Sequence, residues 1–189
     1  MRKVVCVDID ETLVYSRSRK PFKGCTTFKD PTDGYLCHTI ARPGAEEFLE
    51  AVASQFELIS VTQGVVPFQK RVLESLGLLK YFRPVSAFNP NYDSVEDVFP
   101  DKIYGWNTDR IGYTLPDLDD AKWVLVDNLW HRDRTLEDKQ VWINEALHKA
   151  GRKKEWFDPD KNFVRVEEFY GGSVEPLTTY IKEVKQLLC

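Results

Sequence analysis

The sequence predicts an α/β protein built on a doubly wound, Rossmann-like parallel sheet with helices on both faces. Short apolar runs alternate along the chain with segments of helical periodicity, which is typical of this class. Two of the runs also end abruptly in aspartate. The 189 residues suit a single domain spanning 1–189, and we expect insertions at about 15–40, 89–120 and 129–160.

Composition indicates a globular protein without membrane spans. Apolar residues make up 42% and charged residues 30%, and no apolar run is long enough to cross a bilayer. The net charge of -4 argues against a general nucleic-acid binder. No signal peptide precedes the first apolar run and the four cysteines are scattered, so we expect a reduced, cytoplasmic setting, or a nuclear one in a eukaryote.

The first elements follow the apolar runs. Residues 4–7 suit a buried strand, and the turn residues of 15–40 predict a small hairpin insertion with one strand at 35–40. The basic residues of this insertion form either a solvated loop or a rim that attracts phosphate. They are Arg17, Arg19, Lys20, Lys23 and Lys29.

The next elements alternate between helix and strand. The segment 42–44 opens a helix with an apolar face up to residue 53, and a second strand follows at 56–62. A turn at 63–64 leads to a helix over 65–76, which Gly77 ends, and then to a third strand at 84–88. This order predicts parallel strands with right-handed crossovers.

The second half of the chain is less regular. Residues 89–120 are an irregular segment that forms a lid or a substrate rim, and 123–126 is the next strand. We expect a helix over 136–150, a final strand at 162–166 and a closing helix at 174–188. Basic residues just before the 136–150 helix either cap it or contact the substrate. They are His131, Arg132 and Arg134.

Oxygen-bearing side chains lie at three predicted strand ends. They are Asp8, Asp10, Thr62, Asp127 and Asn128. In an open parallel sheet the carboxyl ends of the strands share one edge, where ligands bind. Carboxylate and amide oxygens suit magnesium better than zinc. A zinc site made by Cys25, Cys37 and His38 has suitable ligand types but lacks CxxC spacing, and ordinary hairpin residues are the better interpretation.

Several motifs resemble one family. Residues 8–13, DIDETL, resemble the DxDxT signature of the haloacid dehalogenase superfamily, in the form typical of its Fcp/Scp branch of NLI-interacting-factor-like small phosphatases. Residues 42–49 are similar to the RPGxxEFL segment of that branch, 56–64 to its second motif and 124–128 to its LILDN motif. The segment 164–188 resembles its last strand and closing helix, so the similarity touches nearly the whole chain.

The resemblance implies a magnesium-dependent phosphomonoester hydrolase that works through an aspartyl-phosphate. Asp8 would be the nucleophile, and Asp10 the general acid and then the general base. The magnesium ligands would be Asp8, the backbone carbonyl of Asp10 and Asn128, with Asp127 close by in the outer shell. Thr62 and the backbone amide of the next residue, Gln63, would hold phosphate oxygens.

The lysine that this superfamily uses to neutralise the phosphoryl group has no obvious counterpart. Lys122 begins its strand, and five residues at about 3.3 Å each put it roughly 16 Å from the catalytic end, so we reject it. Lys102 has the right chemistry but requires an insertion. Arg110 fits the spacing better but presents its charge differently. We favour Lys102 over Arg110.

The substrate class rests on the resemblance alone. It implies a phosphoserine or phosphothreonine protein, whereas the basic residues at 17–29 leave a nucleotide or a polynucleotide 3′-phosphate as alternatives. A non-catalytic binding module of the same fold is disfavoured because both Asp8 and Asp10 are present. A phosphotransferase is a further alternative, and the sequence predicts no oligomeric state.

Overall fold

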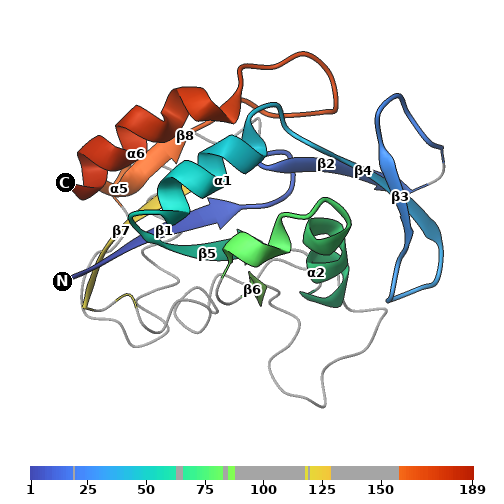
Figure 1. Cartoon of the computed structure of the whole chain (residues 1–189), viewed down its shortest axis with the longest axis horizontal. Coiled ribbons are helices and arrows are strands. Elements are labelled where there is room, and N and C mark those ends of the chain that lie inside the picture. Colours follow the sequence, from blue (N-terminus) through green and yellow to red (C-terminus); the bar gives the residue numbers. More distant parts are fainter. Residues whose placement is uncertain (19, 63–65, 83–84, 88–117, 119, 129–157) are drawn as a thin grey trace.

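A computed structural model describes residues 1–18, 20–62, 66–82, 85–87, 118, 120–128 and 158–189 (Figure 1). Its main feature is a five-stranded sheet in the order β6-β5-β1-β7-β8, in which every neighbouring pair is parallel. The strands are β1 (Arg2–Asp8), β5 (Glu57–Thr62), β6 (Val85–Ala87), β7 (Ala121–Asp127) and β8 (Phe163–Arg165). The predicted fold class is confirmed.

The strand order places a switch point beside the central strand. The chain moves outward from β1 through β5 to β6, and then returns to the other side of β1 for β7 and β8. Val7 of β1 is in register with Val126 of β7, so Asp8 and Asp127 end neighbouring strands at the same edge. Ligands of open α/β sheets bind at such a crevice.

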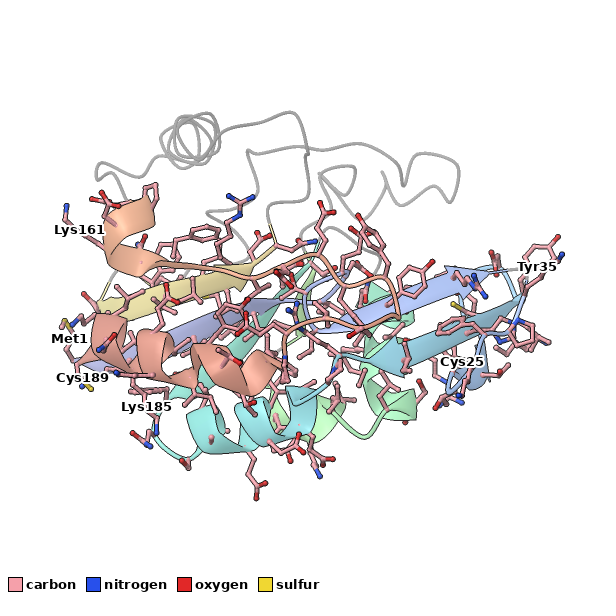
Figure 2. All side chains as sticks on the ribbon, turned by 90° about the horizontal axis from the view of Figure 1, so that it is seen from above. Met1, Cys25, Tyr35, Lys161, Lys185 and Cys189 are labelled. Atoms are coloured by element: carbon pink, nitrogen blue, oxygen red, sulfur yellow. The ribbon has the colours of Figure 1, made fainter. Side chains whose placement is uncertain are left out.

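Helices pack on the sheet because their apolar faces bury the apolar side chains of its strands. Val4–Val7 of β1 are fully buried, as expected for a strand covered on both faces. Helices α1 (Ala45–Ala53) and α6 (Ile181–Leu188) lie together on one face, and the short α5 (Pro159–Asn162) lies on the other (Figure 2). Helix α2 (Val66–Ser75) packs against β6 and the insertion.

The insertion after β1 is a three-stranded antiparallel sheet in the order β2-β4-β3, one strand larger than the predicted hairpin. It is formed by β2 (Val14–Ser18), β3 (Thr26–Lys29) and β4 (Leu36–Ala41). This sheet projects beyond the carboxyl end of β1, away from both termini (Figure 1). Phe28 of β3 packs on Phe68 of α2, with ring centroids 5.8 Å apart, which holds the insertion against that helix.

The C-terminal helix begins later than predicted. A 3₁₀ turn, η6 (Leu177–Tyr180), precedes α6, and residues 174–176 are not helical. Pro176 has an extended ψ of 141° and lacks an amide hydrogen, which explains why the predicted helix over 174–188 was too long at its start. A second 3₁₀ turn, η1 (Leu79–Tyr81), follows α2.

The remaining predicted elements differ in how much of them is described. Asn162 closes α5, so the last strand is shorter than the predicted 162–166. The predicted helix at 136–150 lies outside the described residues, as do residues 89–117 and 119 of the irregular segment predicted at 89–120. Within the described ranges, no helix combines the length and the apolar character needed to cross a bilayer.

Candidate active site

Asp8 is the last residue of β1, and Asp10 lies in the tight turn that follows at residues 9–14, which we call the aspartate loop. Ile9 is fully buried, and its carbonyl accepts hydrogen bonds from the backbone amides of Leu13 and Val14, both at 3.0 Å. The amide of Glu11 donates to the carbonyl of Val14 at 2.8 Å, and Glu11 adopts a left-handed φ of 61°. Non-glycine residues rarely adopt this conformation, and it is found mainly where the surroundings impose it.

Asp10 faces the β5 side of the sheet. Its Oδ2 accepts a hydrogen bond from Nε2 of Gln69 at 2.7 Å and one from the Thr62 hydroxyl at 3.3 Å. The pKa of Asp10 is raised to about 6, chiefly because desolvation disfavours the charged carboxylate. The hydrogen bonds from Thr62 and Gln69 lower the pKa in part, and the nearby charge of Glu11 raises it. A carboxyl with this pKa can exist in either protonation state near neutral pH, as an acid and base must.

The other side of the loop is fixed to the end of β7. The fully buried Thr12 accepts a hydrogen bond on its hydroxyl from the backbone amide of Asn128 at 3.1 Å. The Asn128 side chain is only 2% exposed, and neither its Oδ1 nor its Nδ2 has a partner among the described residues. Buried amides nearly always have hydrogen-bond partners. The unpartnered amide therefore indicates a ligand at this position.

This donor set fits a magnesium ion. The amide oxygen of Asn128 is buried and unpartnered, and Asp8 ends the neighbouring strand, so both hard oxygen ligands come from the same edge. The described part of the chain contains no group of three or more histidine, cysteine, aspartate or glutamate side chains that could hold a metal ion. The predicted set does not require such a cluster, because an amide and a backbone carbonyl complete it.

The zinc alternative finds no support in the insertion. The Sγ of Cys37 donates to the carbonyl of Arg17, and Nδ1 of His38 is 2.8 Å from the Thr27 hydroxyl. These groups therefore have partners within the antiparallel sheet. Cys25 and the other three cysteines form no disulfide.

Arg42 is a buried positioning residue that sequence reasoning missed. It is 1% exposed, and its guanidinium donates to the carbonyls of Thr12 at 3.4 Å and Glu167 at 2.6 Å. Two further bonds of 3.1 and 3.0 Å reach the carbonyl of Glu175. The guanidinium thus joins the aspartate loop to the segment at residues 167–178, which we call the C-terminal segment. The sequence had indicated a helix start and a resemblance to the RPGxxEFL segment at this point, but no role for the arginine.

The C-terminal segment also contacts this region through its backbone. The amide of Phe169 donates to the carbonyl of Glu11 at 2.7 Å, and that of Leu177 to the carbonyl of Pro43 at 2.8 Å. Gly44 has a φ of 73°, and a Cβ there would lie 3.2 Å from the backbone nitrogen of Thr178. Glycine is therefore required both for the turn and for the close approach.

Gln69 is the second residue that was missed. It is 1% exposed on α2, three residues before the buried Val72 and next to Phe68. A polar residue on the apolar face of a predicted helix was the available signal. Its Nε2 binds Asp10, whereas its buried Oε1 has no partner among the described residues.

Some of the other predicted site residues are described by the structure, and some are not. Lys122 lies opposite Lys3 near the start of β7, at the end of the sheet away from Asp127, which agrees with its rejection. Six further residues lie outside the described ranges: Gln63, Lys102, Arg110, His131, Arg132 and Arg134. Asp8, Asp10, Thr62, Asp127 and Asn128 do gather at the carboxyl edge of the sheet.

A Rossmann-like sheet with this aspartate loop at the end of its central strand has the features of a haloacid dehalogenase-type phosphatase domain. More specifically, residues 3–88 match the NLI interacting factor-like phosphatase family. The match includes the aspartate loop, Arg42, Thr62 and Gln69, and it confirms the predicted resemblance to this family of phosphatases. No protein of curated function matches the sequence significantly.

Two solved structures are similar to the chain. The first, the structure of Fcp1, an essential RNA polymerase II CTD phosphatase, shares 18% identity with a TM-score of 0.49 and matches 98% of this chain and 49% of that chain. The second is a variant of the fission yeast RNA polymerase II CTD phosphatase Fcp1 bound to beryllium fluoride. It shares 16% identity with a TM-score of 0.47, and the match covers 99% of this chain and 50% of that chain. The chain thus spans about half the length of these structures.

Proposed function

We propose that this protein is a magnesium-dependent phosphomonoester hydrolase that forms an aspartyl-phosphate on Asp8. The observation that supports this most is the pairing of Asp8 at the end of β1 with a partly buried Asp10 whose pKa is raised to about 6. The buried, unpartnered amide of Asn128 at the adjacent strand end supports a metal ligand there. The phosphatase family match covers both aspartates.

The two carboxyl groups divide the reaction between them. In the first step a carboxylate oxygen of Asp8 attacks phosphorus, the bond from phosphorus to the leaving oxygen breaks, and Asp10 gives its proton to that oxygen. In the second step Asp10 takes a proton from water as the water attacks the aspartyl-phosphate. Phosphate leaves, the Asp8 carboxylate is regenerated and Asp10 is protonated again. A bound magnesium ion would offset the repulsion between the Asp8 carboxylate and the phosphate.

Magnesium should be required, and Asn128 should set its affinity. We expect EDTA to abolish hydrolysis of p-nitrophenyl phosphate and added magnesium to restore it. Asn128→Ala should raise the magnesium concentration that gives half-maximal activity by at least about tenfold, because a ligand is lost. Asn162→Ala, remote from the site in α5, is the control. Full activity in EDTA, or an unchanged magnesium requirement in Asn128→Ala, would contradict the assignment.

The substrate that we propose is a phosphoserine or phosphothreonine side chain in a protein, which is the class that the branch resemblance implies. A nucleotide or a polynucleotide 3′-phosphate is the second candidate. The observation in its favour is the basic insertion, in which Lys20 and Lys23 are exposed between β2 and β3 and could attract a polyanion.

A substrate panel separates these classes. We expect phosphoserine and phosphothreonine peptides to give kcat/KM values at least about tenfold higher than nucleotides or 3′-phosphorylated oligonucleotides, a difference within the usual range of substrate discrimination. The measurement is release of inorganic phosphate at equal magnesium concentration. If kcat/KM were instead about tenfold higher for the 3′-phosphorylated oligonucleotides, the proposed substrate would be a nucleic-acid end and not a phosphoprotein. The proposed hydrolase mechanism would be unaffected.

A further inference from the structure

We infer that Gln69 is a positioning residue that selects which oxygen of Asp10 carries the proton for the leaving group. This inference rests on the proposed function, because it concerns the acid step of that reaction. Nothing in the family match assigns a role to this glutamine. Its contact with Asp10 joins residues 59 positions apart, from α2 to the loop after β1.

The inference begins with the geometry of the Asp10 carboxyl. Both donors, Nε2 of Gln69 at 2.7 Å and the Thr62 hydroxyl at 3.3 Å, point at the same oxygen, Oδ2. A proton on Oδ2 would face two hydrogens that already point at it. The transferable proton therefore belongs on Oδ1, because both of these donors bind the other oxygen.

The position of Gln69 supports a role beyond packing. The side chain is 1% exposed, and its Oε1 is buried without a partner in the part of the chain that the structure describes. An unpaired buried amide oxygen is destabilising, and leucine or methionine would fill a similar volume without that penalty. Stability therefore gives no reason for an amide here, whereas the bond from Nε2 to Asp10 does.

Leaving-group dependence provides the test. An alcohol such as phenol needs a proton as it departs, whereas 2,4-dinitrophenolate leaves readily without one. We expect Gln69→Met to lower kcat/KM for phenyl phosphate about tenfold, because the lost hydrogen bond is made to the carboxylate that forms as Asp10 gives up its proton. Activity on 2,4-dinitrophenyl phosphate should fall by less than about twofold, because that step does not use the acid. A purely structural defect would lower both rates together.

Three further variants make the outcome decisive. Asp10→Asn should show the same selectivity more strongly, and adding Gln69→Met to it should cause no further loss on phenyl phosphate. Ser60→Ala is the control, because Ser60 is fully buried on the same face of β5 as Thr62 but has no described partner. It should leave the ratio of the two rates unchanged. Gln69→Leu repeats the test if the methionine variant does not fold, as judged from its unfolding midpoint.

The results distinguish this inference from the proposed function. If the wild-type protein hydrolyses neither ester in magnesium, the proposed function fails and the role of Gln69 fails with it. If the wild type is active and Asp10→Asn is selective, equal losses on both esters in a folded Gln69 variant overturn the role of Gln69 alone. An unchanged rate on both esters in that variant overturns it too.

Discussion

Replacing Asp8 with asparagine should lower the turnover of p-nitrophenyl phosphate by at least about 10⁴-fold, as expected when the nucleophile of a covalent mechanism is lost. The side chain keeps its size and stays at the end of β1, but an amide does not attack phosphorus. Steady-state release of p-nitrophenol in magnesium measures the effect. The wild-type and variant proteins should unfold at similar denaturant concentrations. The loss of turnover would then be due to the missing nucleophile and not to unfolding.

Asp120→Asn is the matched control for this variant. Asp120 is exposed and lies just before β7, at the opposite end of that strand from Asp127. The same chemical change there should leave turnover within about twofold of wild type, because surface substitutions away from a site have small effects. Turnover of Asp8→Asn close to that of Asp120→Asn would show that Asp8 is not the nucleophile.

Arg42→Met should cause the largest loss of stability among single substitutions near the site. The guanidinium is 1% exposed and binds the backbone carbonyls of three residues, Thr12, Glu167 and Glu175. Methionine fills part of the space but leaves these acceptors without their donor. We expect the free energy of unfolding to fall by about 3 kcal/mol, measured by urea denaturation, in the range seen when buried polar networks are broken.

Two companion variants identify the cause of that loss. Arg42→Lys keeps the charge, but one ammonium group cannot bind the carbonyls of both the aspartate loop and the C-terminal segment as the planar guanidinium does. Arg42→Lys should therefore be more stable than Arg42→Met but less stable than the wild type. Arg71→Met removes an exposed arginine that pairs with Glu74 at 2.6 Å, and it should cost under about 1 kcal/mol. If Arg42→Met were as stable as Arg71→Met, the structural role of Arg42 would be wrong.

The parallel sheet could be predicted because local pattern and tertiary environment agree. The Val4–Val7 run is fully buried, and the similar run in β7 ends at Asp127, so short apolar stretches identified both strands correctly. The strand ends then brought Asp8, Asp127 and Asn128 to one edge without any need for side-chain detail. Parallel topology thus carries much of the information about the site.

The insertion was predicted less well, because its strands are short and polar. Ser16 and Arg17 lie in β2, and Thr26, Thr27 and Lys29 in β3, so neither strand has the apolar pattern that reveals a buried one. Their stability comes from pairing with β4, as in Ser16 with Thr39 and Thr26 with Thr39. Such cross-strand partners are not visible from local sequence.

The positioning residues could not be predicted, because their partners are distant in sequence. Arg42 reaches Glu175 across 133 positions, and Gln69 reaches Asp10 across 59. Periodicity identifies the face of a helix that is buried but not what lies opposite it. Only the folded chain shows that a polar residue on the buried face of α2 meets the carboxyl group of Asp10.

Trapping the covalent intermediate tests the central claim most directly. The protein is mixed with p-nitrophenyl phosphate and magnesium, quenched in acid, reduced with borohydride and digested, and the modified peptide is identified by mass spectrometry. We predict a reduced acyl-phosphate product at Asp8, absent from Asp8→Asn and from a sample without substrate. Modification of a different residue, or normal turnover with no trapped product at any quench time, would contradict the account.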